Sequence, residues 1–229
     1  DERWKDYLHT YRLTFRDGNS QSVQLVQEGK TLERVPATGG THWLTANGAV
    51  ADFGQPASQS ATYTALYPGE LVIAHSQYVN GYTVACTTDG YLYVMQHGKF
   101  EPTPVCYLNA ILIDMAYNKA DGKLYAMAVL NDENGEPQYG KLVTVDMFTG
   151  ELTEIGSITS DMMPSSRDGE VPQVLAISDD GTFYVINAST RNTYLYSFRL
   201  TEDGKIGELT KVGKTGFKAN YLQSMAFDH

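Results

Sequence analysis

Short apolar runs separated by turn residues fill most of the chain. In TYLYSFRL (193–200) every second side chain from Tyr194 onward is apolar, which is the period-2 pattern of a half-buried strand. In LYAMAV (124–129) both faces are apolar, as expected for a strand packed between two sheets. No window of about a dozen residues keeps apolar positions at helical spacing without Gly, Pro or Asn. The pattern therefore predicts an all-β chain with stacked sheets.

A hairpin phrase recurs in the second part of the chain. The stretches 114–129 (DMAYNKADGKLYAMAV) and 174–187 (VLAISDDGTFYVIN) each place two apolar runs around an Asp-Gly turn. Four alanines stand in the first strand of such phrases, and glycines close the turns of the first three: Ala85, Ala116, Ala176 and Ala226, then Gly90, Gly122 and Gly181. Two more strands follow the second and third hairpins. Four antiparallel strands in units of about 40 to 50 residues predict the blades of a β-propeller.

Counted in this way, residues 69–229 contain a short first unit, two full units and the opening strand LQSMAFDH of a fourth. A closed propeller typically has about four to eight blades. We therefore expect a partial β-propeller, an incomplete ring. The chain is then a fragment of a longer protein, or a second chain or missing segment completes the ring, because an open ring leaves apolar faces exposed.

Turns of the types DGKLY and DMFTGEL occur in this part of the chain, which resembles bacterial β-propeller repeats. The resemblance implies an architecture and no particular activity.

Residues 1–68 follow another order: YRLTF with Gly18, VQEGKTL, Pro36, HWLTANG, ADFGQPAS and the closing strand TYTALY. Over about 60 residues this order resembles the Listeria–Bacteroides repeat, a β-grasp-like module of bacterial surface proteins. His42 stands where that repeat usually has Gly, and the closing strand lacks its final Trp. The resemblance implies a small β-grasp-like domain over 1–68 in a secreted or cell-surface bacterial protein. The dipeptide Pro68-Gly69 predicts the hinge to the second domain.

Four aromatic residues are spread over this first domain: Phe15, Trp43, Phe53 and Tyr63. Large aromatic side chains supply much of the buried area of a small domain. We expect them to form one core, with Trp43 inside it and not serving as a sugar-stacking platform.

Charge and composition limit the classes of partner that the chain is expected to bind. The net charge is −10, from 17 Lys and Arg against 27 Asp and Glu, which would repel a phosphate backbone and argues against nucleic acid. No run approaches the roughly 20 apolar residues of a membrane helix, so we expect no membrane insertion. Sixteen Tyr give a polar-aromatic surface suited to glycan or protein ligands.

Cys86 and Cys106 form either a disulfide or two buried free thiols. The hairpin pattern puts a third strand between theirs, which holds the Cα atoms farther apart than the roughly 7 Å limit of a disulfide. Free thiols are therefore favoured.

No motif for catalysis, metal binding or cofactor binding stands out. The histidines are scattered, and the acidic loop NDENGEP lacks the ligand spacing of a calcium-binding EF-hand. SDDGTF (178–183) is one residue short of the Asp-box of sialidase-type propellers, and only three arginines lie in this part of the chain. The sequence thus predicts no enzyme activity, no cofactor and no metal.

Binding residues are expected on the loops between strands. The candidates are Asp132, Glu133 and Tyr139 in the insert 131–139, Arg167 in the connection 160–171, and Arg191 in the loop 187–192.

Three functions stay open. The favoured one is a non-enzymatic binding or adhesion module that presents propeller loops to a glycan or protein ligand at the cell exterior. The second is an accessory region of a larger secreted hydrolase, a protease or glycosidase, whose catalytic domain lies outside this chain. The third is a passive spacer.

Overall fold

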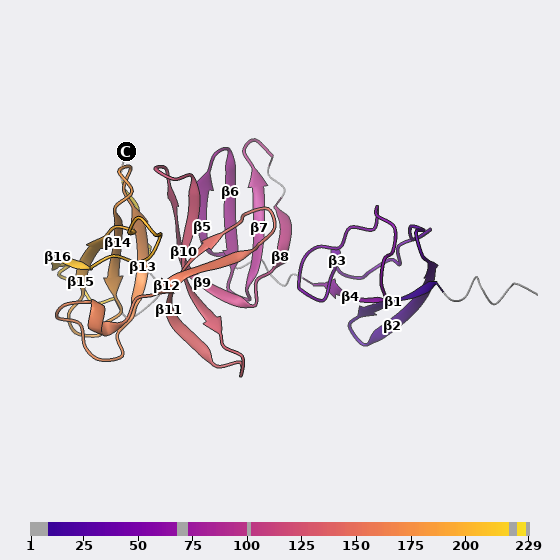
Figure 1. The fold of residues 1–229 in the computed structure, drawn as a ribbon, viewed down its shortest axis with the longest axis horizontal. Helices are drawn as coiled ribbons and strands as arrows, with labels where there is room; N and C mark the ends of the chain where they lie inside the picture. Colours follow the sequence, from indigo (N-terminus) through magenta and orange to yellow (C-terminus); the bar gives the residue numbers. More distant parts are fainter. Residues whose placement is uncertain (1–8, 68–72, 100–101, 220–223, 228–229) are drawn as a thin grey trace, which may run out of the picture. The chain divides into compact units, whose positions relative to one another are not determined.

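The computed structural model describes residues 9–67, 73–99, 102–219 and 224–227 (Figure 1). Internal contacts divide the chain into two units, Asp1–Leu71 and Val72–His229. The predicted hinge at Pro68-Gly69 lies outside the described residues. Within the described part of the chain no helix has the length and apolar character needed to cross a bilayer.

In the first unit, residues 9–67 form a mixed four-stranded sheet with the order β2-β1-β4-β3. Its strands are β1 (Thr10–Asp17), β2 (Ser20–Gln27), β3 (His42–Leu44) and β4 (Ala61–Leu66). β1 and β2 form an antiparallel hairpin, while β1 and β4 run parallel in the middle of the sheet. The first and last strands are therefore neighbours, in agreement with a β-grasp-like fold.

The predicted aromatic core of this unit is confirmed. The Phe15 ring lies 5.1 Å from that of Trp43 and 5.2 Å from that of Tyr63, and Phe53 completes the group. Phe15 and Trp43 are buried, and the Trp43 indole donates a hydrogen bond of 2.9 Å to the carbonyl of Pro36. Trp43 is thus a core residue.

The described residues of the second unit form three four-stranded sheets, each antiparallel and each with its strands in chain order. The first sheet has β5 (Ile73–Val79), β6 (Tyr82–Thr87), β7 (Tyr91–Gln96) and β8 (Thr103–Tyr107). The second has β9 (Ala110–Asn118), β10 (Lys123–Asn131), β11 (Pro137–Val145) and β12 (Leu152–Ser157). The third has β13 (Pro172–Ile177), β14 (Phe183–Asn187), β15 (Tyr194–Phe198) and β16 (Thr210–Lys214), preceded by the short 3-10 helix η2 (Ser160–Met162).

The first strands of the three sheets meet, since β9 contacts both β5 and β13. We call β5, β9 and β13 the innermost strands. The middle sheet is covered on both faces, as the run 124–129 predicts. Leu124, Ala126 and Ala128 pack with the first sheet, while Tyr125 and Met127 pack with the third. The fold class is therefore all-β, with propeller-like four-stranded sheets following a small mixed-sheet domain.

The predicted short first unit is wrong, because its sheet is complete. β5 carries His75, Ser76 and Gln77 in succession, and this polar run hides the strand from an apolar pattern. As a result Ala85 lies on the second strand of its sheet, whereas Ala116 and Ala176 lie on first strands. The described residues 224–227 around Ala226 form no strand.

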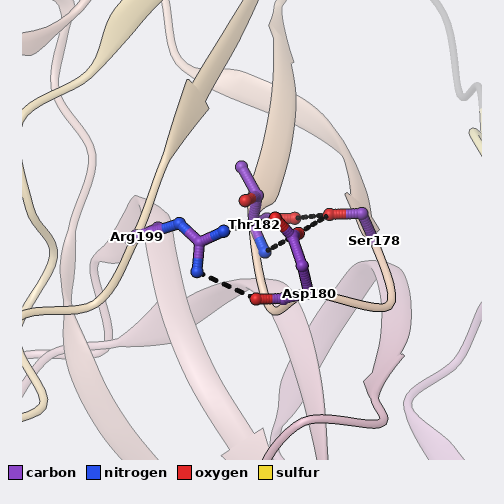
Figure 2. Close-up of polar contacts among 4 residues, drawn as sticks. All are labelled: Ser178, Asp180, Thr182 and Arg199. Carbon is purple, nitrogen blue, oxygen red and sulfur yellow. Dashed lines mark hydrogen bonds and ion pairs between the residues drawn. The ribbon is translucent and has the colours of Figure 1, made fainter.

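The Asp-Gly turns are stabilised by their own side chains. In the turn between β13 and β14, Asp180 Oδ1 accepts hydrogen bonds from the Ser178 hydroxyl (2.6 Å) and Thr182 N (3.1 Å). Arg199 donates to the Asp180 carbonyl (2.9 Å) and carboxylate, as Figure 2 shows. These hydrogen bonds, chiefly those from Ser178 and Thr182, lower the pKa of Asp180 to about 2. The stretch that approaches an Asp-box is thus a closed structural turn.

The same turn chemistry recurs. The hydroxyls of Thr87 and Thr201 donate to an Asp two residues later, and the next residue is a glycine with positive φ. The sequence pattern Ser/Thr-x-Asp-Gly therefore forms the turn at 87–90, 178–181 and 201–204. At 166–169 the same pattern lies in the β12–β13 connection, and the Ser166 hydroxyl donates to Glu170 instead.

Cys86 and Cys106 are free and buried, as the sequence favours. Leu92 of β7 pairs with Cys86 on one side and with Cys106 on the other. The intervening strand keeps the two thiols apart.

Candidate functional site

The second unit has two ends, defined by its innermost strands. The entry end is where β5, β9 and β13 begin, and the exit end is where they finish. Because the strands alternate in direction, the β10–β11 loop, the β12–β13 connection and the β14–β15 loop all lie at the entry end. Four of the five binding residues predicted from sequence lie in these segments. Tyr139 was expected in the loop but lies near the start of β11, so the structure still brings all five to the entry end.

The β10–β11 loop is a closed turn. Asp132 Oδ1 accepts hydrogen bonds from the backbone N–H groups of Asn134 (2.8 Å) and Glu136 (2.9 Å). This carboxylate oxygen is therefore engaged by its own loop. Glu133 and Tyr139 are exposed nearby, with 57% of Tyr139 accessible.

Glu170 ties the other two entry-end loops together. Its Oε2 accepts hydrogen bonds from Asn187 Nδ2 (2.6 Å), the Ser166 hydroxyl (2.9 Å) and Arg167 N (3.1 Å). Partial burial by itself raises the pKa of Glu170, but hydrogen bonds from Ser189 and these three donors outweigh it and lower the pKa.

Arg167 and Arg191 therefore stand on loops that are held in place. Arg191 N also donates to the Ser189 hydroxyl. No described residue accepts a hydrogen bond from either guanidinium. Their role in binding remains a prediction.

Two adjoining hollows lie at the exit end. The first, of about 470 Å³, lies between the ends of the three innermost strands and the segment Met225–Phe227. The second, of about 400 Å³, lies between the β5–β6, β9–β10 and β11–β12 turns. Asn80 and Tyr117 line both hollows. We call this joined surface the exit groove.

A hydrogen-bonded pair separates the two halves of the exit groove. Asn80 Nδ2 donates to the Tyr117 hydroxyl at 2.8 Å. Asn80 has a φ of 45° and Gly81 a φ of 89°, the left-handed pair required at the centre of a two-residue hairpin turn. The tight turn thus fixes the Asn80 amide over Tyr117, and no described residue donates to Asn80 Oδ1.

Exposed aromatic rings line the exit groove on both sides of this pair. Tyr78 is 57% exposed, Phe148 58% and Phe227 40%. Phe148 and Phe227 each rest one edge on another ring, that of Tyr82 at 5.3 Å and that of Tyr184 at 5.2 Å. Each ring is therefore positioned by one contact while part of its surface remains open.

Charges at the exit groove are balanced. Lys119 Nζ lies 2.9 Å from Asp179 Oδ1, and both side chains are more than half exposed. Lys123 and Glu151 border the other half. The exit groove therefore has no excess of positive or negative charge at its border. Its contacts with a ligand would be apolar contacts and hydrogen bonds.

A buried carboxylate lies close to the first half of the exit groove. Asp114 of β9 is 2% exposed and accepts hydrogen bonds from Leu175 N (3.0 Å), Met115 N (3.0 Å) and the Ser224 hydroxyl (3.1 Å). His75 Nδ1 of β5 lies 3.4 Å from the same carboxylate. Asp114 therefore joins all three innermost strands to the segment 224–227.

The sequence reasoning missed both Asp114 and the exit groove. A lone Asp in the apolar run LIDMA was a usable signal, because an unpaired charge is rarely buried. The groove had a weaker signal, namely aromatic residues beside turns. Among the described residues, no group of three His, Cys, Asp or Glu side chains is placed to hold a metal ion.

The first unit has a hollow of its own, of about 570 Å³, over Leu13, Phe53 and Tyr63. The two rings are half-buried and pack edge to face at 4.9 Å. The base of this hollow is thus the aromatic core, and it presents no strongly exposed ring.

Comparisons of sequence and of structure with known proteins give different outcomes. No family model and no curated protein matches the chain. Among solved structures, YCF48 bound to D1 peptide is similar at 15% identity and a TM-score of 0.41, over 88% of this chain and 66% of that one. The chain therefore spans slightly less than two thirds of that protein. A protein from Lactobacillus plantarum is similar at 12% identity and a TM-score of 0.32, over 90% and 82% of the two chains.

Both TM-scores lie below 0.5, so no role is transferred from either protein. The structure itself places the chain in the class of all-β proteins with propeller-like four-stranded sheets.

Proposed function

We propose that the chain is a non-enzymatic binding module whose ligand is a peptide segment of another protein, held in the exit groove. The observation that carries the proposal is the set of three exposed aromatic rings over two adjoining hollows. Exposed apolar surface gathered in a concave site is typical of an interaction site.

The pair between the two halves suits a peptide backbone. The Tyr117 hydroxyl accepts from Asn80, which leaves its own O–H free to donate to a ligand carbonyl. Asn80 Oδ1 is available to accept from a ligand N–H. One peptide unit crossing the pair would therefore be satisfied on both sides, while its flanking side chains enter the two hollows.

The setting that we propose is a secreted or surface-attached bacterial protein. Support for it comes from the resemblance of residues 1–68 to a surface-protein module. Adhesion would then follow from binding a peptide segment of a neighbouring protein.

The test is selection of random peptides from a display library on the immobilised full chain. Binding of the selected peptides is then measured with Tyr78→Ala, at the exit groove, and with Tyr139→Ala, at the entry end. These two tyrosines are a matched pair, since each is 57% exposed. We expect Tyr78→Ala to weaken binding by roughly 5- to 30-fold, the loss of about 1–2 kcal/mol usual for an aromatic anchor. Tyr139→Ala should leave it unchanged.

The reverse result would assign binding to the entry-end loops, and the double variant Arg167→Ala/Arg191→Ala would then locate it there. Failure to enrich any peptide, together with specific binding on a glycan array, would overturn the ligand class.

A further inference from the structure

We propose that the surface beside the first half of the exit groove is a docking site for a short segment with a hydroxyl residue, an apolar residue next to it and an aromatic residue two positions later. This surface is formed by Asp114, Val174, Leu195 and Tyr184. Its present occupant is the chain's own segment Ser224–Phe227, and the same segment supplied as a separate peptide exchanges with it. The inference goes beyond the proposed function, because the docked segment forms one wall of the exit groove and does not fill it.

The segment Ser224–Phe227 is held through its side chains. The Ser224 hydroxyl donates to Asp114, Met225 packs beside Val174 and Leu195, and the Phe227 ring meets that of Tyr184. No backbone group of 224–227 bonds to the backbone of another described residue. The segment is therefore docked on β9 and on the third sheet without being a strand of any described sheet.

This attachment is shallow. Ser224, Ala226 and Phe227 are exposed, and only Met225 is half-buried. A segment that contributes few buried apolar contacts and no backbone ladder belongs to the least stable part of a fold. Exchange with an equivalent segment is thus possible while the three sheets stay folded.

Asp114 supplies the selectivity. Leu175 N and Met115 N reach its carboxylate from the innermost strands, so these two donors are present whether or not the segment is docked. The Ser224 hydroxyl is the donor that arrives with the segment. A buried carboxylate left short of a donor is unfavourable, so this position favours an occupant with a hydroxyl group.

The apolar positions follow from the third sheet. Val174 and Leu195 form a small cluster with buried Ile186 and Ala219, and Met225 covers it. Tyr184 lies one strand farther out and receives the ring of Phe227. Ala226, which lies between Met225 and Phe227, is exposed. The site therefore contacts the first, second and fourth residues of the segment.

The experiment uses a fluorescent peptide with the sequence of residues 221–229, YLQSMAFDH, and full-length chains. In the double variant Ser224→Ala/Phe227→Ala the internal segment loses two of its three contacts. Fluorescence anisotropy should show the peptide binding this variant at least about tenfold more tightly than the unmodified chain. The reason is that the chain's own segment, which competes with the peptide for the same site, is weakened in the variant. A peptide with the same two alanines should bind the variant about tenfold more weakly than the original peptide.

Tyr184→Ala, added to the double variant, should also reduce binding of the original peptide, whereas Tyr139→Ala should not. Equal binding of the original and alanine peptides, or no binding to the double variant, would overturn the proposal. Either result leaves the proposed function standing if displayed peptides still require Tyr78, because the segment would then be a permanent wall of the exit groove.

Discussion

Gly150 lies where a turn of the middle sheet meets a strand of the first sheet. It closes the β11–β12 turn, has a φ of 74° and donates a hydrogen bond of 2.8 Å to the Asp146 carbonyl. A Cβ atom at this position would overlap the sulfur of Cys106 on β8. This position therefore requires glycine for two reasons: the backbone is left-handed, and there is no room for a side chain.

We expect Gly150→Ala to destabilise the second unit by about 2–4 kcal/mol, from the left-handed backbone and the overlap together. Gly135→Ala is the control, because Gly135 has a φ of 82° but no atom within 4 Å of a new Cβ. Gly135→Ala should lower the free energy of unfolding only by the cost of a left-handed backbone at alanine, about 1–2 kcal/mol. Urea unfolding of the full chains measures both, and equal losses would show that the contact with Cys106 is unimportant.

At the residue scale the sequence predicted roles that depend on near neighbours. Trp43 in the core and Asp121-Gly122 in a turn are such cases, and both are confirmed. Asp132 was predicted to bind a ligand because it lies on a loop. In the structure its carboxylate accepts a hydrogen bond from the backbone of that same loop. Asp114 was missed because two of its three donors, Leu175 N and the Ser224 hydroxyl, come from distant segments.

At the element scale, β7 decides the chemistry of the two cysteines. It lies between β6 and β8 and separates the thiols. Burial raises the pKa of both from 9.0 to about 11. The thiolate, which is the reactive form, is therefore rarer in the folded chain than in the unfolded chain at any pH below about 11.

We expect both thiols to resist iodoacetamide in the native chain at pH 8 and to react in urea at the same pH. Because the folded pKa is raised, reactivity in the native state should increase only as the pH rises from about 9 toward 11. Mass spectrometry counts the modified cysteines. Rapid native labelling at pH 8, or a disulfide formed under mild oxidation without unfolding, would contradict the strand order.

Strand prediction worked where one face of a strand is uniformly apolar and failed where polar residues serve a partner. β10 and β15 were predicted because their apolar positions meet neighbouring sheets. β5 was missed because His75, within its polar run, is buried against Asp114 of β9. A polar residue in a strand is acceptable when another strand supplies its partner, and the local pattern cannot show this.

At the scale of the whole molecule, each unit has its own core. Phe15 and Trp43 belong to one, and Met127 to another in the second unit. Both tryptophans, Trp4 and Trp43, lie in the range Asp1–Leu71. Tryptophan fluorescence therefore reports on the first unit, while far-UV circular dichroism is dominated by the strands of the second.

We expect Met127→Ala to cost about 2–5 kcal/mol, as usual for truncating a buried methionine, and to move the dichroism transition in urea to lower concentration. The tryptophan transition should stay in place. Leu13→Ala, in the core of the first unit, should do the reverse. If either substitution moves both transitions together, the two units unfold as one.

The sequence by itself determined the all-β class, the hairpin turns, the aromatic core of the first unit and the two-faced strand of the middle sheet. Each of these depends on residues within a few positions of one another, where backbone geometry and alternation act directly. Only the tertiary structure decided that β5 completes the first sheet, that Asp114 joins three sheets, and that the exit groove forms where their strands end. These features depend on contacts between distant residues, such as Asp114 with Ser224, which are 110 positions apart. No local pattern contains the partner of a side chain that far away.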